Sequence, residues 1–231
     1  MSFSRWRSLV DGTEVDVGSE IPDSGILHGW PISGTTTPIP DAVGSASISL
    51  NGGTQFDTST DAWWEDNAVL FDGNDGYGVV DSDQQDPGDS GILTMTVHYL
   101  SISENQEYAF ANPDTTNDRR LYVRSDNGNL EVNIADATTI ELLSNPSENT
   151  TYRVGIRWDT GDWTGYLDGS PVGSGTYPGT MSLAGANWFF GSVLADEGFA
   201  NVIVDYPRIG GEPWDDQLFQ DEYEAMPWVS A

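Results

Sequence analysis

The acidic residues near the start of the chain are the first candidates for chemistry. Glu14, Asp16 and Glu20 are separated by even numbers of residues, so in a β-strand their carboxylates would lie on one face. Two carboxylates about 5 Å apart across a glycosidic bond can hydrolyse it with retention of configuration. The spacing therefore permits glycoside hydrolysis, although a chain with 37 acidic residues contains such spacings by chance.

Two acidic stretches are candidates for a calcium site, because calcium takes carboxylate and carbonyl oxygens from loops. The first stretch contains Asp72 and Asp75, and the second contains Asp81 and Asp83. Neither has the spacing of an EF-hand, and a strongly acidic surface has such loops without any bound ion. We expect no required cofactor, and these four residues are the metal site to consider if calcium binds.

Tryptophan residues beside polar residues are candidates for ligand binding. Trp63 and Trp64 lie in a polar stretch, and Trp163 follows Asp162. An indole ring can lie against the apolar face of a sugar, although burial in the core is the commoner place for tryptophan. We predict that these four residues bind a ligand, and we assign no catalytic residue.

The charge balance points to an environment of very high salt. The chain has 37 Asp and Glu against 8 basic residues, a formal charge of −29, and every basic residue is arginine. Strong salt screens the self-repulsion, while dense carboxylates hold water and ions at the surface. We therefore expect the source to be an extreme halophile or one of its viruses. The alternative, an acidic disordered chain, would lack the 9 Trp, 9 Tyr and 8 Phe found here.

The same composition excludes several partners and constrains others. No cluster of positive charge is available for nucleic acid, and no stretch is long and apolar enough for membrane insertion. There is no cysteine, hence no disulfide framework. The opening residues lack the apolar run of a secretory signal, so we expect no export by a signal of the chain's own. Arg5, Trp6 and Arg7 are expected to dock on an acidic partner subunit.

Most of the other arginines are expected to pair with carboxylates, within a sheet or at a subunit interface. They are Arg119, Arg120, Arg124, Arg153 and Arg157. His28 and His98 are too few and too far apart to indicate a zinc site, and we expect both to be structural.

Short alternating segments separated by Gly, Asp, Asn and Pro predict an all-β sandwich. Residues 94–100 place Met95, Val97 and Tyr99 on a core face and leave a wetter opposite face. Further strands are expected at 121–123, 130–134, 152–158, 163–167, 187–193 and 201–205, with turns at 125–128, 159–162 and 168–169.

One short helix is expected over residues 214–225, before Pro227. Residues 1–24 lack a sustained hydrophobic period, so we interpret them as an N-terminal arm or docking segment. Residues 25–231 then form a single domain.

Four segments in order resemble the concanavalin A-like lectin and glucanase superfamily, which includes laminin G-like domains. They are Gly29-Trp30-Pro31, residues 68–77 (AVLFDGNDGY), residues 151–169 (TYRVGIRWDTGDWTGYLDG) and residues 199–208 (FANVIVDYPR). The resemblance covers residues 25–231 and implies a two-sheet antiparallel jelly roll.

The resemblance implies less about function, because this fold carries lectins, adhesion modules, glycoside hydrolases and virion proteins. Laminarinase-type hydrolases of this fold use Glu-x-Asp-x-Glu on a central strand. Here Glu20 is displaced by two residues and the segment precedes the first sandwich strand, so we expect no enzyme.

Three interpretations of function follow. In the first, the protein is a structural or attachment component at the surface of a haloarchaeal virus particle (a decoration, turret, spike or tail protein), meeting other virion proteins and host glycans. In the second, it is a free-standing lectin, extracellular or on the cell surface of a halophile. In the third, it is a laminarinase-type hydrolase. For the first we expect a homo-oligomer, since virion components often form closed assemblies.

Overall fold

The structure is a computed structural model of the 231-residue chain. It describes residues 24–59, 67–80, 86–102, 106–112, 121–134, 138–177, 183, 187–195 and 197–226, and the backbone alone of residues 3–4, 7–10, 13–16 and 21–22.

The described chain is almost entirely β-strand, as the sequence predicts, with one helix near the C-terminus. The strands are β1 (Phe3–Ser4), β2 (Arg7–Val10), β3 (Thr13–Asp16), β4 (Ile21–Pro22), β5 (Ile26–Gly29), β6 (Ile48–Asn51), β7 (Gln55–Asp57), β8 (Ala68–Asp72), β9 (Tyr77–Val80), β10 (Ser90–Tyr99), β11 (Glu107–Asn112), β12 (Leu121–Asp126), β13 (Asn129–Ile134), β14 (Thr138–Ser144), β15 (Thr150–Asp159), β16 (Asp162–Leu167), β17 (Ser170–Thr176), β18 (Trp188–Phe190) and β19 (Asn201–Gly210). The helix is α1 (Asp216–Glu224).

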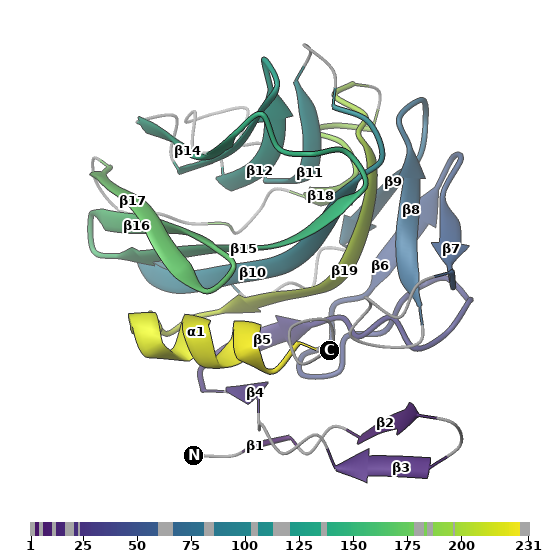
Figure 1. Cartoon of the computed structure of the whole chain (residues 1–231), viewed down its shortest axis with the longest axis horizontal. Coiled ribbons are helices and arrows are strands. Elements are labelled where there is room, and N and C mark those ends of the chain that lie inside the picture. The colour runs from purple at the N-terminus through teal and green to yellow at the C-terminus, as the bar shows by residue number, and fades with distance from the viewer. Residues whose placement is uncertain are drawn as a thin grey trace.

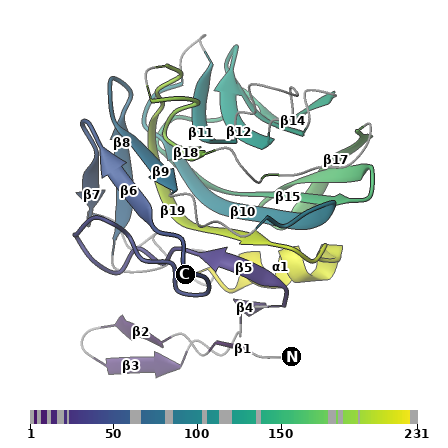
Figure 2. The ribbon, with the colours of Figure 1, turned by 180° about the vertical axis from the view of Figure 1, so that it is seen from behind.

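Two antiparallel sheets form a sandwich, and this confirms the predicted jelly roll (Figure 1). The first sheet has the order β17-β16-β15-β10-β19-β8-β7, with β5 also pairing β19. The second has the order β14-β13-β12-β11-β18-β9-β6. The short strands β1 to β4 pair only among themselves. Both views place α1 against the first sheet, on the side away from the second (Figures 1 and 2).

The core lies between the two sheets and follows from the alternation of side chains along each strand. In β10, Met95, Val97 and Tyr99 point into it, as predicted. In β15, Val154 and Trp158 do the same, which leaves the intervening arginines on the opposite face of the first sheet.

Two hairpins confirm the predicted turn positions. Asn127 and Gly128 have φ of 50° and 77°, and Asp168 and Gly169 have φ of 49° and 77°. Two successive positive φ angles are what a two-residue type I′ turn requires, and Asn-Gly and Asp-Gly supply them at low steric cost. The Asn-Gly turn therefore fixes the register of β12 on β13, and the Asp-Gly turn restricts the register of β16 on β17.

Helix α1 is attached to the outer face of the first sheet by buried charge. Glu222 accepts hydrogen bonds from Arg153 Nη2 at 2.8 Å and Arg208 Nη1 at 2.9 Å, and all three side chains are buried. Arg153 also donates to the hydroxyls of Thr94 and Thr96. These two threonines were expected on a wetter face; they are fully buried because the helix and its ion pairs cover them.

Apolar packing completes the attachment. The rings of Phe219 and Tyr166 stack with centroids 3.8 Å apart, and Trp214 packs edge-on to Phe219. Gly155 lies beneath them, where a Cβ atom would come within 2.7 Å of the Phe219 ring. A side chain at this position would therefore lift the helix from the sheet.

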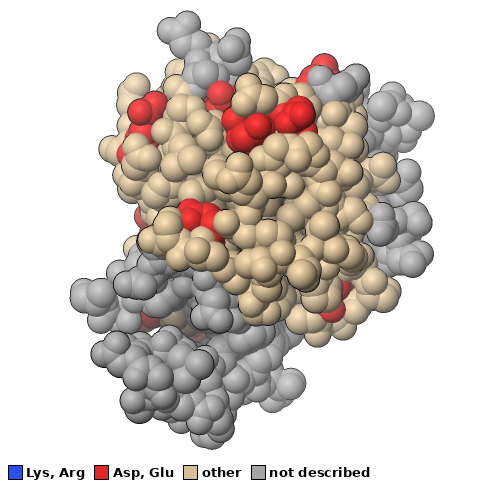
Figure 3. Space-filling model, turned by 90° about the vertical axis from the view of Figure 1, so that its right-hand side faces the viewer, with Lys and Arg blue, Asp and Glu red and all other residues tan. Residues whose placement is uncertain are grey.

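The outer surface is strongly acidic, in keeping with the formal charge of −29. On the face shown in Figure 3, carboxylates form several patches, and no Lys or Arg of the described residues is visible. No helix among the described residues has the length and apolar character needed to cross a membrane.

Candidate functional site

A depression lies on the outer face of the first sheet, beside the start of α1. The helix begins at Asp216, with Asp215 as its N-cap, so it leaves the end of the sheet near the β15–β16 turn uncovered. The depression has a volume of about 400 Å³, which is within the range of small-ligand sites. Its lining comprises Arg157, Asp159, Thr160, Asp162, Trp163, Thr164, Pro213, Trp214 and Asp215.

The floor of the depression is built from polar residues in cross-strand rows. Arg157 of β15 lies opposite Thr164 of β16, which lies opposite Ser174 of β17. The next row toward the turn runs from Asp159 through Asp162 to Thr176. Because adjacent strands are about 4.8 Å apart, each row spans about 10 Å across three strands. Ser174 and Thr176 extend the polar surface past the rim.

Among the described residues that line the depression, Arg157 is the only basic one, and its position is fixed by several contacts. It donates to Asp216 Oδ1 at 3.0 Å, to the Trp214 carbonyl at 3.2 Å and to Thr164 Oγ1 at 3.3 Å. Its guanidinium also lies 5.6 Å from the ring centre of Tyr166. The side chain remains 29% exposed. These contacts use three of its five N–H donors, so two have no hydrogen-bond partner among the described residues.

Asp216 receives a second hydrogen bond from Tyr166 Oη at 2.7 Å. Burial, together with this bond to a carboxylate, raises the pKa of Tyr166 above its usual value, so the phenol remains a donor at all ordinary pH values. The neutral Tyr166 hydroxyl therefore holds Asp216 in position for its ion pair with Arg157.

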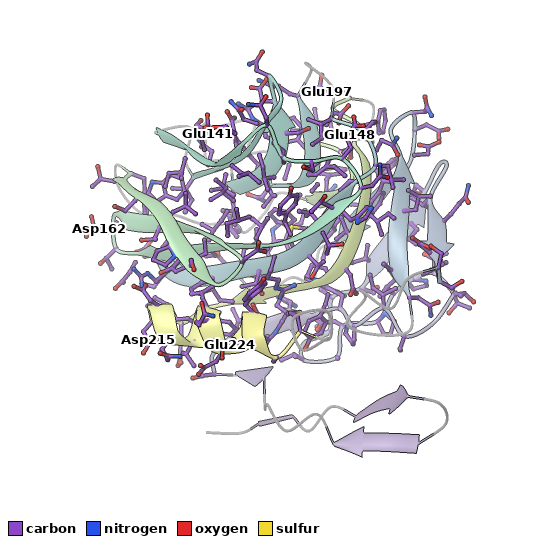
Figure 4. All side chains as sticks on the ribbon, in the orientation of Figure 1. Glu141, Glu148, Asp162, Glu197, Asp215 and Glu224 are labelled. Atoms are coloured by element: carbon purple, nitrogen blue, oxygen red, sulfur yellow. The ribbon has the colours of Figure 1, made fainter. Side chains whose placement is uncertain are left out.

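The three carboxylates of the lining differ in how they are used. Asp159 accepts from Ser90 Oγ at 2.7 Å, and Asp215 accepts from the backbone amide of Leu218 at 2.9 Å. Asp162 is exposed, and no described residue donates a hydrogen bond to its carboxylate. Figure 4 shows Asp162 and Asp215 at the same end of the molecule, one from the start of β16 and one from the start of α1. Asp162 is thus the carboxylate most open to a ligand.

The two tryptophans of the lining contribute their edges and backbone. Trp163 was predicted as a stacking platform, but it is 1% exposed and its ring belongs to the core between the sheets. Trp214 is also 1% exposed, and its Nε1 donates to the Ser24 carbonyl. Neither ring is exposed enough to stack on a ligand, so the groups that the depression offers are hydrogen-bonding ones.

Several other predicted site residues lie outside the described part of the chain. For Arg7, Glu14 and Asp16 the structure describes only the strand backbone. The others are Arg5, Trp6, Glu20, Trp63, Trp64, Asp81, Asp83, Arg119 and Arg120.

The described half of the predicted calcium site is occupied by the protein's own amides. Asp72 Oδ1 accepts from the backbone amides of Asn74, Asp75 and Gly76, at 3.0, 3.2 and 3.1 Å. The amide of Asn74 makes the largest contribution to a lowered pKa of Asp72. Asp75 Oδ1 accepts from the amide of Gly53. Across the described ranges, no three His, Asp or Glu side chains gather as metal ligands would.

The outer face of the second sheet carries a charged network centred on Arg124. Arg124 pairs with Asp126 at 2.8 Å and Glu131 at 3.1 Å, as expected for a structural arginine. It also lies over the Tyr122 ring at 4.7 Å and donates to Tyr108 Oη. With its donors committed and only 11% of its side chain exposed, Arg124 offers a ligand less than Arg157 does.

The sequence prediction identified Asp162 and Trp163 of the lining but none of its other residues. Arg157 was expected only as a structural residue, and the structure shows it both paired and exposed to the depression. The signal for the row of Arg157 and Thr164 was present, because a two-residue turn after Asp159 sets them opposite each other. No local signal shows that Pro213 and Asp215 form the facing wall.

Comparisons with known proteins support the fold. No protein-family model matches the sequence, and no curated protein is similar to it. Among solved structures, the botulinum neurotoxin serotype D binding domain is 14% identical with a TM-score of 0.66, over 87% of this chain and 50% of that one. This chain thus spans about half of the botulinum chains it matches.

Two further structures come from carbohydrate-active enzymes. Domain 4 of AbnA, an extracellular arabinanase from Geobacillus stearothermophilus solved with arabinotriose, has a TM-score of 0.64 and 14% identity over 86% of this chain and 98% of that domain. Trypanosoma rangeli sialidase has a TM-score of 0.70 and 13% identity, over 88% of this chain and 33% of the sialidase. At these identities the likeness shows a common sandwich fold.

Proposed function

We propose that the protein is a non-enzymatic, lectin-like module that binds a carbohydrate in the depression beside α1. One observation carries the proposal: the depression holds polar groups in two cross-strand rows, including an open carboxylate, Asp162, and unused donors of Arg157. Sugar hydroxyls both donate and accept hydrogen bonds, so a surface that offers both kinds of partner suits them.

Two of the similar structures support the binding part of this proposal. Domain 4 of the arabinanase was solved in complex with arabinotriose and matches almost its whole length to this chain. The botulinum chain is described as a binding domain. Because the similarity to these structures shows the fold alone, the proposed ligand rests on the residues that line this chain's own depression.

The proposal is tested by glycan-array screening followed by titration calorimetry with the best ligand. We expect binding, no change in the glycan over prolonged incubation, and loss of at least about tenfold in affinity for Asp162→Ala, because a charged acceptor contributes about 1.5–3 kcal/mol. Glu197→Ala removes another exposed carboxylate, far from the depression, and is expected to bind normally (Figure 4). Equal affinities of the two variants would refute the assigned site.

Metal removal is a separate check. Because the described acidic loop around Asp72 is held by backbone amides, we propose that binding needs no calcium. Chelation should leave the affinity unchanged, and a loss restored by added calcium would contradict this.

We further propose that the module acts at the surface of a virus particle or cell in very high salt, as a homo-oligomer attached through residues 1–10. The charge of −29 with no lysine supports the high-salt part. Light-scattering mass in about 3 M salt tests the assembly, and deletion of residues 1–10 should abolish it. A protein that is monomeric both with and without residues 1–10 would leave the free-standing lectin as the better interpretation.

A further inference from the structure

We infer that the depression selects neutral glycans and rejects those that carry carboxylates, such as uronic and sialic acids. This inference rests on the proposed function and specifies the ligand class of the same site.

The lining of the depression is negatively charged. Its described residues include the carboxylates of Asp159, Asp162 and Asp215 and the guanidinium of Arg157, which together give a net charge of −2. A ligand carboxylate among these groups meets a repulsion that salt screens, because all three aspartates are exposed. The formal charge of −29 also slows the approach of any anion.

Arg157 does not offset this repulsion, because its charge is already matched. Asp216, which lies just outside the lining, accepts from the guanidinium at 3.0 Å and is held in place by the Tyr166 hydroxyl. Both Nη1 donors are used, by Asp216 and the Trp214 carbonyl, and one Nη2 donor is used by Thr164. The Nε–H and the second Nη2–H remain for a ligand. Because the guanidinium charge is already paired with Asp216, these donors attract a carboxylate less strongly than those of an unpaired arginine would.

Hydrogen bonding also favours neutral glycans over those with carboxylates, and salt does not screen this preference. A carboxylate on a sugar only accepts hydrogen bonds, and so do Asp159 and Asp162. A hydroxyl at the same place donates to them. The hydroxyls of Thr164, Ser174 and Thr176, which continue the rows, can adapt as donor or acceptor. A neutral polyhydroxy chain is the ligand that satisfies this surface with the fewest unpaired groups.

The test uses one array that holds neutral oligosaccharides beside matched uronate and sialylated ones, for example galactotriose beside trigalacturonic acid. We expect neutral glycans to bind at least about tenfold more tightly in low salt, with a smaller preference that persists in about 1 M salt, where the Debye length falls to about 3 Å. Uronates or sialosides that bind as tightly as neutral glycans would overturn this inference and leave carbohydrate binding intact. Absence of binding to every glycan would overturn the proposed function, and the inference with it.

Charge reversal locates the effect. Asp162→Arg should narrow the preference for neutral over acidic glycans several-fold, because it changes the lining from net −2 to net 0. Glu197→Arg makes the same change in total charge on a loop distant from the depression (Figure 4). Equal narrowing by both variants would show that total charge, and not this site, sets the preference. Should Asp162→Arg misfold, Asp162→Asn provides the smaller change at the same position.

Discussion

Glu222 is the buried carboxylate that holds α1, and its replacement by glutamine tests how the wall of the depression is supported. Its two oxygens accept from Arg153, Arg208 and the hydroxyl of Thr94, at distances of 2.8–3.2 Å. Glutamine keeps the shape and one acceptor oxygen but removes the charge. Two buried guanidinium groups then lose the carboxylate that they share.

Removal of one partner from a buried ion pair destabilises a protein by about 3–5 kcal/mol. For a chain of this size, 1 kcal/mol shifts the melting temperature by about 2–4 °C, so Glu222→Gln should lower Tm by about 6–20 °C. Differential scanning calorimetry measures the change. Glu224→Gln, on the exposed side of the same helix, is the control and should shift stability by less than about 0.5 kcal/mol.

The effect of pH gives an independent check. Burial acts to raise the pKa of Glu222, but Arg153 and Arg208 outweigh it and hold the pKa below its usual value of 4.5. A lowered pKa means that the stabilisation is present above pH 4.5 and is lost as the pH falls through the native pKa. The stability difference between the native protein and Glu222→Gln should therefore shrink below pH 4.5. A difference below about 1 kcal/mol at pH 7, or one independent of pH, would refute the reasoning.

Three further predictions concern a turn, the contact of strand β5 with Asp41, and salt. Gly128 has φ of 77°, and no atom lies closer than 3.9 Å to an added Cβ. Gly128→Ala should therefore lower the unfolding free energy by about 1–2 kcal/mol through backbone strain alone. Gly34→Ala is the control and should be neutral, and urea titration compares the two variants. Asp41 accepts from His28 Nδ1 at 2.5 Å and from the amides of Val43 and Gly44 at 2.9 Å, so Asp41→Asn should lower the unfolding free energy by about 1–3 kcal/mol, and an unchanged urea midpoint would contradict this. The thermal midpoint should rise as salt increases from about 0.1 M to about 3 M, because screening relieves repulsion among charges that sum to −29; a flat response would argue against adaptation to salt.

The fold was predictable because its signals are local. Alternation along residues 94–100 and the Asn-Gly turn at Asn127 each specify a strand or a hairpin without distant information. The helix also began and ended within two residues of its expected bounds.

The burial of Thr94 was not predictable, because Arg153 and Glu222 meet across 69 residues of sequence. Only the fold reveals that a helix covers that face of the sheet.

The candidate site was half predictable for the same reason. Asp162 and its turn were visible, and the burial of Trp163 follows from its pairing with Trp158, since cross-strand neighbours share a face. The facing wall required α1 to fold back onto the sheet, where Pro213 and Asp215 come to border the depression.

Carbohydrate binding in the depression can be tested by chemical-shift mapping. The ¹⁵N-labelled protein is titrated with the best neutral oligosaccharide from the array. Binding in the depression should give shifts that saturate and cluster at residues 157–164, 174–176 and 214–216. Saturating shifts on the outer face of the second sheet, around Tyr122 and Arg124, would contradict it.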